Sequence, residues 1–142
     1  MTKKTLVAVT LAFSVLLASC GIPNLKNTKN APDSFAGEWE SDGTILDIWV
    51  DDDGVCHGEV TRVLEENVVS FWSFSGEPEN GAFSYSDGKK ITATYDEGGD
   101  VSEDHVYEDG RGSITKNKEG LIWEDKVEDA GSGQTFTYTG EY

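Results

Sequence analysis

The chain has 142 residues, enough for one domain, and carries 27 Asp and Glu against 11 Lys and Arg, a net charge of -16. This charge would repel a phosphate backbone, which excludes a nucleic-acid-binding protein. Two cysteines are too few for a disulfide-stapled mini-protein, and 4 Trp, 6 Phe and 5 Tyr are too many for a disordered chain.

Residues 1–19 have the pattern of a secretory signal peptide. Lys3 and Lys4 form a basic start, and residues 5–17 form an uncharged, largely apolar run. A membrane-spanning helix needs about 20 apolar residues, so this run is too short for a permanent span. Its length and its basic flank are typical of a cleaved signal peptide.

The run ends in Leu17-Ala18-Ser19-Cys20, which resembles the lipobox of bacterial lipoproteins: an aliphatic residue, two small residues and a cysteine. The resemblance implies cleavage before Cys20, lipid on the Cys20 sulfur, and a protein anchored to a bacterial membrane that faces outside the cytoplasm. Two or three acyl chains hold a protein stably where one chain binds only marginally. The alternative is an ordinary signal peptide followed by an unrelated cysteine.

Residues 20–34 are predicted to be the lipidated cysteine and a flexible tether, because they hold two Pro and three Asn and show no apolar period. The chain after residue 19 keeps 27 acidic residues and 9 of the 11 basic ones, since Lys3 and Lys4 are removed, so its net charge is 9 - 27 = -18. Residues 35–142 form the predicted domain.

This domain is predicted to be all-β. Gly with Asp, Asn or Glu recurs about every ten residues, a spacing that suggests a barrel or a sandwich. Asp53-Gly54, Asp87-Gly88 and Asp109-Gly110 each suit a type I′ hairpin turn. The predicted strands cover residues 35–40, 44–50, 55–64, 68–75, 82–86, 90–95, 101–107, 112–115, 121–125 and 134–140.

Apolar and polar residues alternate in several of these strands, and Leu46, Ile48 and Val50 share one face. Such alternation predicts an antiparallel sheet with one buried face. Eight to ten short strands joined by tight turns favour a closed up-and-down (meander) barrel, because closure removes the exposed edges. A β-sandwich is the alternative. A barrel of about eight strands is either filled by side chains or holds one small ligand.

Gly37-Glu38-Trp39 resembles the Gly-x-Trp opening of the lipocalin and avidin-like barrels, which are grouped as calycins. The resemblance implies a lipocalin-like barrel over residues 35–142. In lipocalins an Arg or Lys late in the barrel packs across this Trp. The last predicted strand here has neither, which departs from the family pattern.

Aromatic side chains are the candidate ligand-binding residues, because Tyr and Trp combine an apolar body with one polar group and suit pockets for apolar or aromatic ligands. The alternative is that they form the core, since a small β domain must bury a large area. The candidates are Trp39, Trp72, Phe74, Tyr85, Tyr95 and Trp123.

No metal, cofactor or catalytic site is predicted. Asp51-Asp52-Asp53-Gly54 fails the EF-hand pattern because Trp49 takes its first position, so solvated turns are favoured over calcium. Cys56 and His57 point to opposite faces of a strand and cannot both bind one metal without distortion. A zinc site needs three or four N or S ligands, and the domain supplies only these two and His105. The chain has no nucleophile elbow, phosphate-binding loop or dinucleotide motif.

Two functions follow from these observations. The leading hypothesis is a lipid-anchored binding module that holds a small apolar or aromatic ligand inside the barrel. The alternative is a domain whose acidic surface binds a cationic protein, for example to inhibit a basic cell-wall-lytic enzyme, because the charge would steer such a partner.

Overall fold

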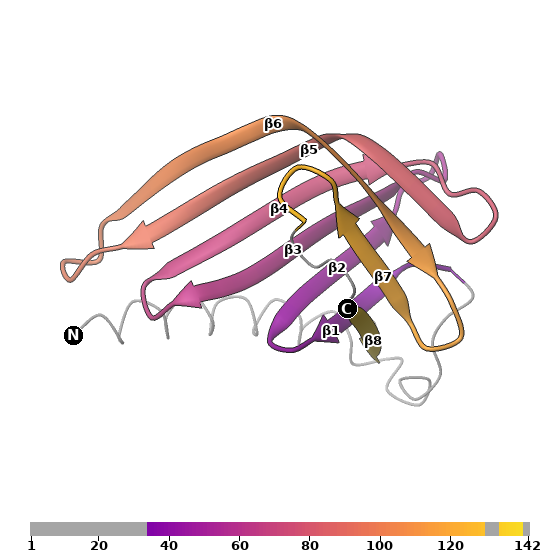
Figure 1. The fold of residues 1–142 in the computed structure, drawn as a ribbon, viewed down its shortest axis with the longest axis horizontal. Helices are drawn as coiled ribbons and strands as arrows, with labels where there is room; N and C mark the ends of the chain where they lie inside the picture. Colours follow the sequence, from indigo (N-terminus) through magenta and orange to yellow (C-terminus); the bar gives the residue numbers. More distant parts are fainter. Residues whose placement is uncertain (1–33, 130–133, 141–142) are drawn as a thin grey trace.

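The computed structural model describes residues 34–129 and 134–140, so residues 1–33, with Cys20 and the predicted signal peptide, lie outside them. Within the described part, eight antiparallel strands follow one another around a closed ring (Figure 1). They are β1 (Gly37–Ser41), β2 (Thr44–Val50), β3 (Cys56–Glu65), β4 (Val68–Gly76), β5 (Ala82–Tyr95), β6 (Val101–Lys116), β7 (Leu121–Asp125) and β8 (Thr135–Gly140).

Each strand pairs with the next one along the chain, and β1 pairs with β8 to close the ring. This confirms the predicted all-β meander barrel rather than the sandwich alternative. The strand pairing is shortest between β7 and β8, which pair only at Leu121↔Phe136 and Ile122↔Thr135 among the described residues. The strands β3 to β6 are longer, and their ends project beyond the other four (Figure 1).

The prediction of hairpin turns at Asp87-Gly88 and Asp109-Gly110 is wrong. Gly88 and Gly110 lie opposite each other inside β5 and β6, so four predicted short strands merge into two strands of 14 and 16 residues. Packing explains the two glycines, because aromatic rings lie where a side chain would be. A Cβ on Gly88 would lie 2.9 Å from the Tyr85 ring, and a Cβ on Gly110 would overlap the Tyr107 ring. The register shifts here mark bulges, which bend paired strands.

Type I′ geometry occurs at two other dipeptides, which the sequence analysis did not single out. Both residues of Asp42-Gly43 (φ 47° and 77°) and of Asn80-Gly81 (φ 53° and 77°) have positive φ values. Asp42-Gly43 joins β1 to β2, and Asn80-Gly81 precedes β5. At Asp53-Gly54 only the glycine has a positive φ, 83°, so the type I′ prediction is wrong there as well.

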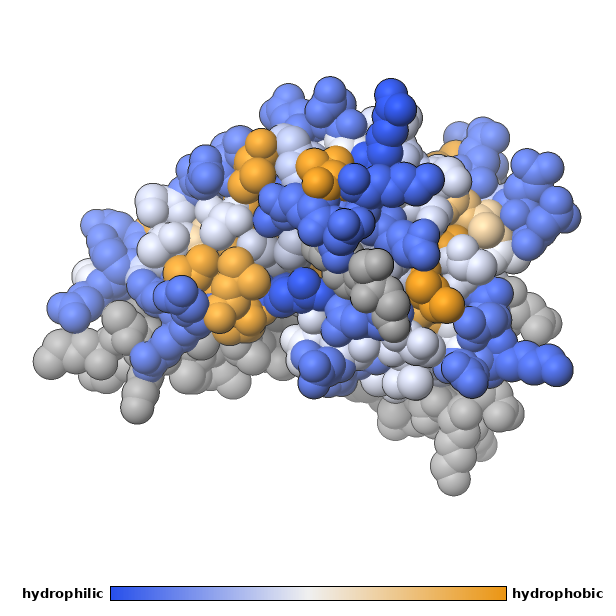
Figure 2. Space-filling model, in the orientation of Figure 1, coloured by the Kyte–Doolittle hydropathy of each residue, from blue (hydrophilic) through white to orange (hydrophobic). Residues whose placement is uncertain are grey.

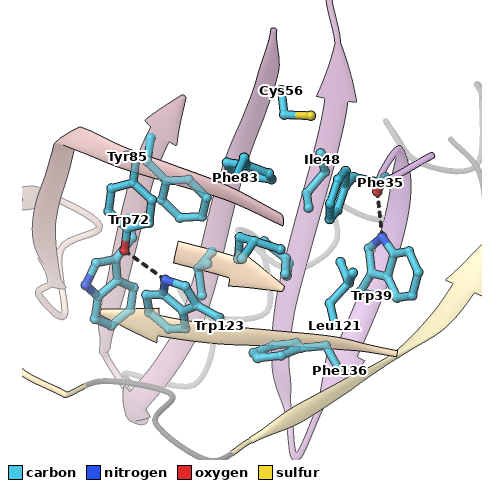
Figure 3. Close-up of a cluster of buried hydrophobic side chains, with 14 residues drawn as sticks. Phe35, Trp39, Ile48, Cys56, Trp72, Phe83, Tyr85, Leu121, Trp123 and Phe136 are labelled. Carbon is cyan, nitrogen blue, oxygen red and sulfur yellow. Dashed lines mark hydrogen bonds between the residues drawn. The ribbon is translucent and has the colours of Figure 1, made fainter. Parts of the chain in front are cut away.

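The core lies inside the ring. Residues that oppose each other across strands share a face, so the registers place Leu46, Val60 and Trp72 in one layer. The buried cluster comprises Phe35, Trp39, Leu46, Ile48, Cys56, Val60, Trp72, Phe74, Phe83, Tyr85, Ile114, Leu121, Trp123 and Phe136, and Figure 3 shows it.

Candidate functional site

Five of the six aromatic candidates belong to this core cluster. The rings of Trp72 and Trp123 meet edge to face at a centroid distance of 5.3 Å, and those of Phe74 and Tyr85 stack at 4.2 Å. Trp39 lies in the same cluster and meets the ring of Tyr138. Each of these five candidates is at most 5% exposed. The structure therefore brings them together as side chains that pack against one another.

Hydrogen bonds inside the core engage two of the indole N–H groups. Trp39 Nε1 donates to the backbone oxygen of Phe35 at 2.9 Å, and Trp123 Nε1 donates to the Tyr85 hydroxyl at 3.0 Å (Figure 3). Burial raises the pKa of Tyr85 well above its usual range. The indole N–H groups of Trp39 and Trp123 thus hold neighbouring core residues in place, whereas the buried Trp72 Nε1 has no hydrogen-bond partner among the described residues.

Tyr95, the sixth candidate, lies elsewhere. It forms a second small cluster with Val69 and Ala93, against which Phe71 packs. Side chains alternate along a strand, so Val69 and Phe71 point away from the face that carries Trp72. Tyr95 therefore belongs to the outer face of β4 and β5, and not to the barrel interior.

Cations lie over two of the core indoles. Arg62 Cζ is 5.7 Å and Lys90 Nζ is 4.9 Å from the centroid of the Trp72 ring, within the range of cation–π interactions. Lys116 Nζ is 6.0 Å from the ring of Trp39. A cation therefore does lie over the Trp of the Gly-x-Trp motif, and it comes from the end of β6 rather than from the last strand.

The outer face of β1, β2 and β3 carries a row of acidic side chains that the sequence analysis did not single out. Glu38 lies opposite Asp47, and Asp47 lies opposite Glu59. We call these three residues the acidic row. Directly opposed residues have Cβ atoms about 4.5–5.5 Å apart, where like charges destabilise a sheet.

Asp47, in the middle of the acidic row, has the least favourable environment. It is 5% exposed, and its buried Oδ1 has no hydrogen-bond partner among the described residues. Burial, followed by the charges of Glu38 and Glu59, raises the pKa of Asp47 to about 7. Buried polar atoms almost always have a hydrogen-bond partner. A donor or a cation is therefore missing beside this carboxylate within the described residues.

An aromatic pair adjoins the acidic row. Trp49 follows Asp47 on the same face of β2 and lies opposite His57 of β3. Their rings stack at 5.5 Å with an interplanar angle of 11°, while Trp49 remains 40% exposed. His57 Nε2 lies 2.8 Å from Asp51 Oδ2, and this hydrogen bond is the main cause that lowers the pKa of Asp51.

A groove opens on the outer face beside this pair, with a volume of about 220 Å³. It runs from β2 to β5 and combines an indole, carboxylates, hydroxyls and one amine. Its lining residues are Trp49, His57, Gly58, Glu59, Ser73, Phe74, Ser75, Asp87 and Lys89.

In two of the acidic turns, an aspartate side chain accepts hydrogen bonds from backbone amides of the same turn. Asp51 Oδ1 accepts hydrogen bonds from the amides of Asp53 and Val55, at 2.9 and 3.0 Å. Asp96 Oδ1 accepts from the amides of Gly98 and Asp100, both at 2.9 Å. Within residues 34–129 and 134–140, no group of three or more His, Cys, Asp or Glu residues is arranged to hold a metal ion.

Comparisons with protein families, with curated proteins and with solved structures found no match to this chain. The part of the chain that the structure describes contains no helix long and apolar enough to cross a membrane.

Proposed function

We propose that this protein is a binding module whose acidic outer face captures a cationic protein, and that lipid on Cys20 holds it on the outside of a bacterial membrane. One observation carries the proposal: Glu38, Asp47 and Glu59 stand in direct register, and the buried Asp47 Oδ1 has no hydrogen-bond partner in the described part of the chain. The lipobox at residues 17–20 supports the anchor.

The acidic row is more than surface charge for solubility. Solubility needs carboxylates on the surface, but it does not need three of them directly opposite one another, where they repel. A cationic group bound between Glu38 and Glu59, which are more exposed than Asp47, would offset that repulsion, and its charge would favour the ionised form of the buried Asp47. The row therefore favours a partner that supplies positive charge.

The whole molecule provides the long-range attraction. The net charge is -16, and hydrophilic residues cover most of the face seen in Figure 2, with hydrophobic residues in separate patches. Such a field steers a basic protein and raises its association rate at low ionic strength. The same field would push the domain away from anionic head groups, which keeps the acidic row accessible.

The binding of a small ligand inside the barrel stays a prediction. The core aromatic side chains contact one another and are at most 5% exposed, so a ligand there would have to displace them. Trp49 and the neighbouring groove already face solvent. The outer face is therefore the better supported site.

The proposal is tested by titrating the full chain, in detergent, with a basic lysozyme and with an acidic protein of similar size. We expect binding of the lysozyme alone, weakened about tenfold or more between 50 and 300 mM salt, because salt screens exposed charges. Binding that does not change with salt, or no binding of the basic protein, would contradict the proposal.

A further inference from the structure

Four outer-face side chains form a compact group at the centre of the proposed face. Asp47 lies opposite Glu59, and two residues further along the same strands Trp49 lies opposite His57. Opposed residues are about 5 Å apart and residues two positions apart on a strand are about 6.6 Å apart. Two carboxylates and a stacked aromatic pair therefore surround an area that suits one side chain.

The ion pairs found between described residues do not include Asp47 or Glu59. Lys89 continues the cross-strand row beyond Ser73, two strands away from Glu59. Neighbouring strands are about 4.8 Å apart, so this backbone separation is roughly 10 Å. No ion pair joins Lys89 to Glu59 among the described residues. His57 directs its Nε2 to Asp51 instead of the acidic row.

A guanidinium group matches this arrangement better than an ammonium group. It is planar, it bonds carboxylates through paired N–H donors, and it stacks on aromatic rings. The partly exposed indole of Trp49 offers a ring beside the two carboxylates. The adjoining groove of about 220 Å³ gives room for the aliphatic part of the side chain.

We propose that Glu59, Glu38 and the Trp49–His57 pair form the receptor for an arginine side chain of the cationic partner, over the buried Asp47 that lies between the two glutamates. This inference rests on the proposed function and names the group that the acidic face recognises. An ammonium group would meet the same charges, but it lacks the planar fork and the stacking surface.

The test compares hexa-arginine and hexa-lysine peptides, which carry equal charge, as probes of the full chain at 150 mM salt. We expect the arginine peptide to bind about tenfold more tightly, and Trp49→Leu to remove most of that difference. The variant E38Q/E59Q should also lose it, because both carboxylates beside Asp47 become neutral. This variant keeps every backbone pairing and relieves repulsion, so we expect it to fold.

The matched control is E97Q/E119Q, which changes the net charge by the same two units at exposed turn residues. It should retain the preference for arginine. Equal binding of the two peptides, with both double variants weakened alike, would overturn the arginine receptor and leave the acidic face in place. Failure of both peptides to bind would overturn the proposed function itself.

Discussion

Asp47 occupies a position in which its ionised form is disfavoured. Its carboxylate is buried on the outer face and faces Glu38 on β1 and Glu59 on β3, and none of the residues that the structure describes hydrogen-bonds its Oδ1. Removing a charge from water is costly unless a partner compensates for it. A free protein therefore holds Asp47 partly protonated near neutral pH, and a bound cation would favour the ionised form.

Replacing Asp47 by Asn should stabilise the free protein in a pH-dependent way. The folded pKa, about 7, lies above the ordinary value of 3.8, so the folded state binds the extra proton between these values. In the wild-type protein, the stability that comes from the proton on Asp47 is fully present below pH 4 and is lost as the pH rises through 7. We expect the advantage of D47N to grow by about 2 kcal/mol between pH 4.5 and 8, a value reduced for solvent screening.

Urea denaturation of both proteins across this pH range measures the difference. An advantage of D47N that does not depend on pH would show that Asp47 titrates normally and would remove the physical basis of the acidic row. Because the comparison is between two proteins that share all other carboxylates, titration of groups such as Asp51 largely cancels.

Part of this residue-scale picture was accessible from the sequence. Alternation correctly predicts that Leu46 and Ile48 point inward, which leaves Asp47 and Trp49 on the other face. A two-residue turn at Asp42-Gly43 would also have placed Glu38 opposite Asp47. The residue opposite Asp47 on β3, Glu59, could not be predicted, because the longer connection after Val50 does not fix the register between β2 and β3.

At the scale of elements, the strands were predicted well except for two predicted breaks, at Asp87-Gly88 and Asp109-Gly110, where β5 and β6 are continuous. Asp-Gly is a strong signal for a hairpin, and the local sequence at Gly88 and Gly110 gives no sign that the two glycines oppose each other. Their role depends on the Tyr85 and Tyr107 rings, and so on tertiary packing. Local turn preference is overridden where a ring occupies the space of a missing side chain.

Replacing Gly110 by Ala should therefore destabilise the barrel. The added Cβ would overlap the Tyr107 ring and lie 3.0 Å from the Gly88 backbone oxygen. We expect a loss of about 2 kcal/mol or more, as for other overpacked sites. The control is Gly98→Ala, whose Cβ would meet Asp96 Oδ1 at 3.4 Å and should cost less than about 0.5 kcal/mol.

Thermal and urea unfolding of the two alanine variants decide this point. Equal stabilities would mean that β5 and β6 adjust freely around residue 110, and that the glycine is not required for the continuous strand. A loss confined to G110A would confirm that packing, rather than a turn, explains this Asp-Gly pair.

At the scale of the molecule, composition and periodicity were enough to predict an all-β meander barrel, because strand alternation and edge removal depend on local pattern and general geometry. The candidate site was not predicted in the same way. The sequence directed attention to the large aromatic residues, most of which the barrel uses as core. The acidic row exists only once three strands are aligned, so it could not be recognised as a cluster beforehand.

The most direct test of the central claim follows the four tryptophan indole N–H signals by NMR while the full chain is titrated with a basic lysozyme. Trp49 is 40% exposed beside the acidic row, whereas Trp39, Trp72 and Trp123 are at most 3% exposed inside the ring. We expect the Trp49 indole and the amides of the acidic row to shift, while the three core indoles keep their positions. Shifts of the Trp72 and Trp123 indoles with no change at Trp49 would contradict the account and place binding inside the barrel.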